Sequence, residues 1–153
     1  MVKFAIFLKA EMDNIDKLVF NEELIFIKYK CTNCGTESET FAGLDPDEEI
    51  DIKGSRGVCN FQAKCKCCSR SFNISFLEKF DYIQENNNKF TKFMTFECRG
   101  VEIIEYDPRA GFIAYCQKTP YELDLSEGDW CDYDEDTSLS LEIFGVSSKI
   151  EKI

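Results

Sequence analysis

The stretches KYKCTNCGTE at residues 28–37 and AKCKCCSRS at residues 63–71 contain two C-x-x-C pairs, and these pairs decide how the chain folds. Two residues between cysteines allow a tight turn to direct both sulfurs at one ion, so four thiolates in two such pairs are typical of a closed tetrahedral zinc site. Gly35, directly after the first pair, supplies the permissive backbone that such a turn often needs. The sequence therefore predicts one structural Zn²⁺ per chain. Its predicted ligands are Cys31, Cys34, Cys65 and Cys68.

Each C-x-x-C pair with its turn is a zinc knuckle. Cys67 leaves an alternative ligand set open, because the second knuckle could use it instead of Cys65 or Cys68. Adjacent cysteines do not easily both satisfy one tetrahedron, so the C-x-x-C pair is favoured. The remaining cysteines are expected to behave as small apolar core residues. These are Cys59, Cys98, Cys116 and Cys131.

Length and charge limit the class of protein. The 153 residues fit one domain or two small ones, and 29 acidic against 18 basic side chains give a net charge of -11, which disfavours a nucleic acid partner. The start MVKFAIFLKAEMD lacks the features of a signal peptide, and no apolar run is long enough to span a membrane. Nine cysteines without a secretory signal indicate a reducing compartment. We expect a soluble cytoplasmic protein, with a nuclear location kept open.

A period of two dominates the hydrophobic pattern, which predicts half-buried strands and an all-β fold. The first strand is clearest, because Phe4, Ile6 and Leu8 alternate with their neighbours. A helical turn is expected only in short pieces such as residues 45–50. The predicted strands cover residues 2–8, 24–29, 59–63, 72–76, 90–98, 101–106, 112–116, 121–125 and 139–143.

A faint internal repeat bears on the domain organisation. Sliding the chain by 89 residues lays Phe4 on Phe93 and Phe7 on Phe96, and with a small gap IFIKYKC then meets GFIAYC. Duplication and chance similarity between β-rich stretches both explain this match. If the repeat is real, the chain consists of a zinc-binding β half at 1–88 and a second β half at 89–153, packed together as one compact unit.

Two charged groups admit more than one interpretation. The acidic run at 129–136 is expected to be a solvated loop around a core-anchoring Trp130, since it lacks the spacing of an EF-hand calcium site. The basic residues near the cysteines could bind nucleic acid or an acidic peptide, but offsetting the negative charge of a four-thiolate zinc centre is the favoured interpretation. These basic residues are Lys28, Lys30, Lys64, Lys66 and Arg70.

Catalysis is not expected. The chain has no histidine, which removes the commonest general base and most catalytic zinc sites. A four-cysteine site leaves no open coordination position for water, and no P-loop or nucleophile-elbow motif is present.

Several motifs together resemble one known family. KCTNCG and KCKCCSR occur in order with KGSRG at 53–57, FECRGVE at 96–102, DPRAGFIA at 107–114 and GDWCDYDE at 128–135. The chain is thereby similar, nearly from end to end, to the eukaryotic CXXC-motif-containing zinc-binding proteins, a family of uncharacterised function. The resemblance implies an all-β fold of two similar antiparallel, sandwich- or barrel-like halves, with one zinc on the four named cysteines and no established activity. Cys67 departs from the family pattern.

Two functional hypotheses of different classes follow. The first is a structural zinc protein that acts by binding another protein. The second is a thiol- or metal-handling protein, in which Cys67 beside a labile knuckle supports metal transfer or redox switching. An RNA-binding zinc ribbon is disfavoured by charge. The oligomeric state does not follow from the sequence.

Overall fold

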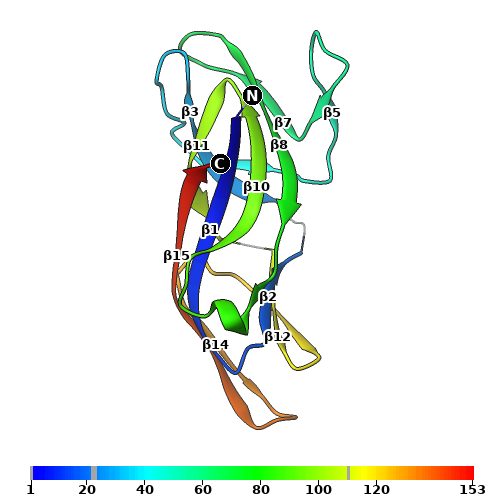
Figure 1. The fold of residues 1–153 in the computed structure, drawn as a ribbon, viewed down its shortest axis with the longest axis vertical. Coiled ribbons are helices and arrows are strands. Elements are labelled where there is room, and N and C mark those ends of the chain that lie inside the picture. Colours follow the sequence, from blue (N-terminus) through cyan, green and yellow to red (C-terminus); the bar gives the residue numbers. More distant parts are fainter. Residues whose placement is uncertain (1, 22–23, 110) are drawn as a thin grey trace.

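The computed structural model describes residues 2–21, 24–109 and 111–153, which form fifteen β-strands and one 3-10 turn (Figure 1). The predicted all-β fold of two antiparallel halves is confirmed. Within these ranges no helix is long and apolar enough to cross a membrane. The elements are β1 Val2–Asp13, β2 Lys17–Phe20, β3 Ile25–Cys31, β4 Ala42–Leu44, β5 Ile50–Asp51, β6 Val58–Cys59, β7 Phe61–Lys64, β8 Ser71–Lys79, β9 Tyr82–Ile83, η1 Gln84–Asn86, β10 Thr91–Arg99, β11 Val101–Asp107, β12 Phe112–Cys116, β13 Thr119–Leu123, β14 Trp130–Asp134 and β15 Leu139–Lys152.

The largest sheet has six antiparallel strands in the order β14-β15-β1-β10-β8-β7 and is called the long sheet below. Two smaller sheets, β13-β12-β2-β9 and β11-β3-β4, accompany it, and β5 pairs with β6. The alternation seen in the sequence places Ile6 and Leu8 of β1 in the core, where neither side chain is exposed.

The strand pairing repeats itself about an axis between β1 and β10, which lie side by side in the middle of the long sheet (Figure 1). Exchanging β1 with β10, β8 with β15 and β7 with β14 leaves the order of the long sheet unchanged. Exchanging β11 with β2, β3 with β12 and β4 with β13 in the same way turns the sheet β11-β3-β4 into β2-β12-β13, which is part of the other small sheet. Each small sheet therefore combines strands from both halves of the chain. The boundary between residues 88 and 89 stays a prediction.

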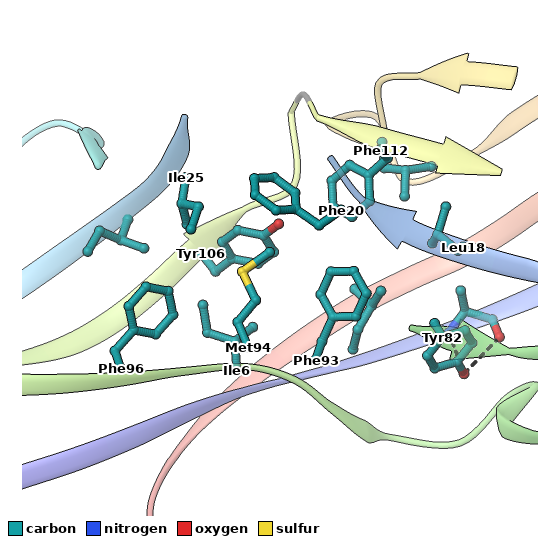
Figure 2. Close-up of a cluster of buried hydrophobic side chains, with 14 of the residues drawn as sticks. Ile6, Leu18, Phe20, Ile25, Tyr82, Phe93, Met94, Phe96, Tyr106 and Phe112 are labelled. Atoms are coloured by element: carbon teal, nitrogen blue, oxygen red, sulfur yellow. Dashed lines mark hydrogen bonds between the residues drawn. The ribbon is translucent and has the colours of Figure 1, made fainter. Parts of the chain in front are cut away.

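Aromatic side chains of the long sheet and the small sheets meet in the core (Figure 2). Phe93 of β10 stacks on Phe112 of β12 with ring centroids 5.9 Å apart, and Phe20 of β2 packs edge-on against Phe112. Full burial of each such side chain contributes about 2 kcal/mol or more of apolar transfer free energy. The buried Tyr82 hydroxyl is hydrogen-bonded: it accepts from the Ala10 amide (3.2 Å) and donates to the Asn86 carbonyl oxygen (2.6 Å).

Three local predictions were wrong. Residues 45–50 form no helix, and the single 3-10 turn of the described residues is η1. The acidic run 129–136 is not a solvated loop throughout, because β14 occupies its centre and the Asp134 side chain is buried. Cys131 is exposed and not a core residue. Trp130 is half-buried and packs against the core, as predicted.

Candidate metal centre

The two C-x-x-C segments adopt the same backbone turn. In the first, the amide of Gly35 donates to the Cys31 carbonyl oxygen (3.0 Å) and the amide of Cys31 donates to the Thr36 carbonyl oxygen (2.9 Å). The second repeats this pattern: the Ser69 amide donates to the Cys65 carbonyl oxygen (2.9 Å), and the Cys65 amide donates to the Arg70 carbonyl oxygen (2.9 Å). Each turn thus brings its two cysteines to the same side.

Both turns need a residue with positive φ immediately after the second cysteine. Gly35 takes this conformation at φ +78°, as the sequence predicts. Ser69 takes it at φ +63°, where a residue with a Cβ atom is strained. The second knuckle is therefore formed at some cost in backbone energy that the first avoids.

The four predicted ligands converge on one point. Their sulfur atoms all lie within 4.8 Å of one another. Cys31 Sγ is 3.7 Å from Cys68 Sγ, and Cys34 Sγ is 3.5 Å from Cys65 Sγ. A tetrahedron with Zn–S bonds of about 2.3 Å has edges of about 3.8 Å, so these separations fit one Zn²⁺ held by four thiolates. Cys67, the alternative ligand, is exposed and lies outside this cluster.

The surroundings of the cluster favour the thiolate form at Cys34 and Cys68 but not at Cys65. At Cys65 the backbone hydrogen bonds of Cys68 and Cys67 are outweighed by burial and the thiols of Cys34 and Cys68, which raise the pKa of Cys65 to about 11. Cys34 Sγ lies 3.2 Å from Thr36 Oγ1, and hydrogen bonding by Thr36 lowers the pKa of Cys34 to about 6. Hydrogen bonding by Asn33 likewise lowers the pKa of Cys68. Because the thiolate is the form that binds metal, both effects assist ligation. Arg70 Nη1 donates to Asn33 Oδ1 (3.3 Å) and so links the two knuckles.

Gly100, in the turn between β10 and β11, contacts the first knuckle on one side and the start of β8, which follows the second knuckle, on the other. Its carbonyl oxygen accepts from the Thr32 amide (3.1 Å) in the first knuckle. On its other side a Cβ atom would come within 3.1 Å of Phe72 Cβ and 3.2 Å of the Ser71 carbonyl oxygen, and its φ is +88°. Only glycine fits this approach. The sequence marked this residue as part of the FECRGVE motif but could not supply its role, which depends on contacts with β8.

A cavity of about 280 Å³ opens beside the cluster. Tyr29 and Phe72, whose ring centroids are 4.8 Å apart, supply much of its apolar lining. Lys64 and Glu37 also line it. Cys31 and Cys65 face this space as well, so the centre is bordered by a partly apolar hollow and not only by bulk water.

The prediction of core cysteines holds for three of the four. Cys59, Cys98 and Cys116 are buried, and burial raises the pKa of the Cys98 thiol to about 12. The buried Cys98 thiol is therefore inert at neutral pH.

Comparison with known proteins places the chain in a family. The family model described as CXXC motif containing zinc binding protein, eukaryotic, matches residues 5–151. The CXXC motif containing zinc binding protein of Rattus norvegicus is 36% identical over 159 residues, with 99% of each chain covered. A UPF0587 protein of Dictyostelium discoideum is 38% identical over 158 residues, covering 100% of this chain and 99% of the relative.

Solved structures share the fold over their full length. The crystal structure of C1orf123 superposes with a TM-score of 0.94 at 35% identity and 99% coverage of both chains. A hypothetical protein from Plasmodium falciparum superposes with a TM-score of 0.91 at 26% identity, covering 99% of this chain and 100% of that one. With four cysteines arranged as one zinc requires, the chain belongs to the eukaryotic CXXC-motif-containing zinc-binding proteins.

Proposed function

We propose that this zinc-binding protein acts by binding another protein, with a single Zn²⁺ that holds the fold and takes no part in chemistry. The observation that carries the proposal is the closed set of four cysteine sulfurs within 4.8 Å of one another. Four thiolates complete a tetrahedron, so no coordination position is left for water or substrate. With no histidine in the chain, no usual general base accompanies the site.

The surface supports a protein partner better than a nucleic acid. The net charge of -11 repels phosphate backbones, whereas basic or mixed-charge protein surfaces are attracted at moderate salt. Of the basic residues near the zinc ligands, Arg70 bonds to Asn33 and Lys28 pairs with Glu105 (3.8 Å). A reducing cytoplasm is the compartment proposed for nine free cysteines.

The test uses zinc-loaded protein on a solid support, with a Cys31→Ser/Cys34→Ser variant as control. A partner retained by the loaded protein is purified, and its saturable binding is measured by calorimetry. We expect one site per chain, with affinity that falls as salt rises. A turnover reaction abolished by one surface substitution in folded, zinc-loaded protein contradicts the proposal.

Exposure of Cys67 favours a second candidate, metal handling. Its thiol lies next to a ligand but outside the four-sulfur cluster, so it could displace one ligand during transfer. The discriminating measurement is the rate of zinc exchange with a chelating acceptor. Rapid exchange that Cys67→Ser abolishes while the fold persists supports metal handling, and equal slow exchange in both proteins supports a structural metal.

A further inference from the structure

The outer edge of β14 is unpaired. Within residues 2–21, 24–109 and 111–153, β14 ends the long sheet and pairs only with β15. Their hairpin projects from the lower end of the molecule (Figure 1). Alternate residues of an edge strand direct their N–H and C=O groups away from the sheet. The Tyr133 amide donates to the Asp132 carboxylate (2.7 Å), which marks it as one of the groups on the open side.

Two other edges of the molecule are blocked in ordinary ways. β13 carries Pro120, which has no N–H to offer. The edge beside β7 is covered, because the Gln62 side chain accepts from the Lys53 amide (3.2 Å) and donates to the Asp51 carbonyl oxygen (3.4 Å). β14 has no proline, and among the described residues its only side-chain cover of this kind is the Asp132 carboxylate at the Tyr133 amide.

The surroundings of β14 are uniformly acidic. Residues 119–148 hold nine of the 29 acidic side chains and none of the 18 basic ones. Among the described residues no ion pair involves any of these nine. Like charges on facing edges repel, so two copies of the chain are kept from pairing through β14, whereas a basic strand is attracted. The nine residues are Glu122, Asp124, Glu127, Asp129, Asp132, Asp134, Glu135, Asp136 and Glu142.

An apolar hollow lies beside this edge. Its volume is about 400 Å³, and Trp130, Cys131 and Phe144 line it. Phe144 is 38% exposed, and Tyr133 on the edge itself is 53% exposed. Exposed aromatic side chains beside an unpaired backbone are typical of surfaces that bind peptides, because the backbone supplies hydrogen bonds and the hollow selects a side chain.

We infer that the open edge of β14 binds an extended, lysine- or arginine-rich segment of a partner protein as an additional strand. One apolar side chain of that segment occupies the hollow beside Phe144, and its basic residues are attracted by the acidic side chains on the two faces of the β14–β15 pair, among them Asp132 and Glu142. The inference rests on the proposed protein-binding function and names the surface and the partner chemistry that serve it.

The test titrates the zinc-loaded protein into a fluorescein-labelled, end-capped peptide of nine residues, in which lysine alternates with valine around a central phenylalanine. A peptide with glutamate at every lysine position is the comparison. The edge variant is Asp132→Lys/Glu142→Lys. The matched control, Glu48→Lys/Glu49→Lys, makes the same change in net charge at exposed residues of the other half.

We expect the edge variant to bind the basic peptide roughly tenfold or more weakly than wild type, and the control variant no more than about twofold more weakly. The affinity of the wild type should fall when the NaCl concentration is raised from about 0.05 M to about 0.3 M. Amide exchange at Tyr133 should slow when the basic peptide binds. Equal losses in both variants, equal binding of the acidic peptide, unchanged exchange at Tyr133, or self-association of the wild type through β14 overturns the inference. A purified partner that binds both variants like wild type overturns the β14 surface but leaves the protein-binding function standing.

Discussion

The two ends of the molecule close corresponding loops by different chemistry. At the zinc end, the loops after β3 and β7 are brought together by four cysteines. At the opposite end, one buried carboxylate, that of Asp134, which is 1% exposed, joins the loop after β14 to β13, the strand that follows β12. It accepts hydrogen bonds from the Tyr121 hydroxyl and the Thr137 hydroxyl, each at 2.5 Å, and from the Thr137 amide at 3.0 Å. We call these three residues with Cys116 the carboxylate cluster.

The correspondence extends to single residues. Phe61 of β7 and Trp130 of β14 each lie opposite an isoleucine of the next strand, and the residue four positions later is Cys65 in one case and Asp134 in the other. Three positions further on, Cys68 corresponds to Thr137. The following residue is a serine with positive φ in both, at +63° and +58°.

Cys116 completes the parallel. It ends β12 as Cys31 ends β3, and its Sγ lies 3.9 Å from Thr137 Oγ1. This turn geometry therefore does not require a metal: a carboxylate with three donors can occupy the place where the other end has two thiolates. The two solutions should respond differently, one to chelation and the other to acid.

Removing zinc should have the largest effect. We expect chelation of the wild type, or Cys34→Ser, to remove folding free energy on the order of 10 kcal/mol and to unfold the loops after β3 and β7 first, since structural zinc contributes directly to folding. Elemental analysis, near-UV dichroism and limited proteolysis measure this. Cys67→Ser is the control and should retain one zinc per chain. Full zinc occupancy in the Cys34→Ser protein would contradict the ligand assignment.

Asp134→Asn should have the next largest effect. The amide removes the charge that three donors face and places an N–H₂ group against at least one of them, so the melting temperature should fall by about 5–10 °C while zinc content is unchanged. Asp132→Asn, at an exposed position of the same strand, should change the melting temperature by about 1 °C or less. Equal shifts in both variants would show that the carboxylate cluster does not hold this end together.

Acid should erase the difference between wild type and Asp134→Asn. Hydrogen bonds from Thr137 and then Tyr121 lower the pKa of Asp134 in the folded state. The ionised group therefore stabilises the fold above its ordinary pKa of about 3.9, and this stabilisation is lost as pH falls through the lower folded pKa. Melting temperatures of both proteins from about pH 7 to about pH 2.5 measure it. Loss of zinc in acid is common to both and cancels in the difference, which should stay constant above about pH 5.

The smallest effect tests the shared turn. Ser69→Gly and Ser138→Gly should each raise the free energy of unfolding by about 0.5–1 kcal/mol, because glycine accepts positive φ without the steric cost of a Cβ atom. Denaturant titration of zinc-loaded protein measures both. Similar increases in the free energy of unfolding for the two variants support the same turn geometry at both ends of the molecule. An increase for only one variant argues against it.

Much of the fold could be predicted because its signals are local. Alternation in β1 and the spacing of Cys31 and Cys34 need no knowledge of the rest of the chain. The carboxylate cluster could not be predicted, since a carboxylate is exposed by default and the partner that decides its burial, Tyr121, lies 13 residues away. β14 was missed for the same reason, because its acidic residues hide a strand. The short strands β2, β4, β5 and β9 have too few residues to show a period.

The interleaved pairing also sets the order in which the molecule can be completed during synthesis. β1 leaves the ribosome first, yet its two neighbours are β10 and β15, the latter ending at Lys152. At about 5–20 residues per second, β1 waits at least several seconds for its first neighbour, with Phe4, Ile6 and Leu8 on an unpaired strand. β3 likewise waits for β11, although Cys31 and Cys34 are made early. The four zinc ligands are thus complete once Cys68 has been made, whereas β11, the strand that pairs with β3 beside them, follows only later in the chain.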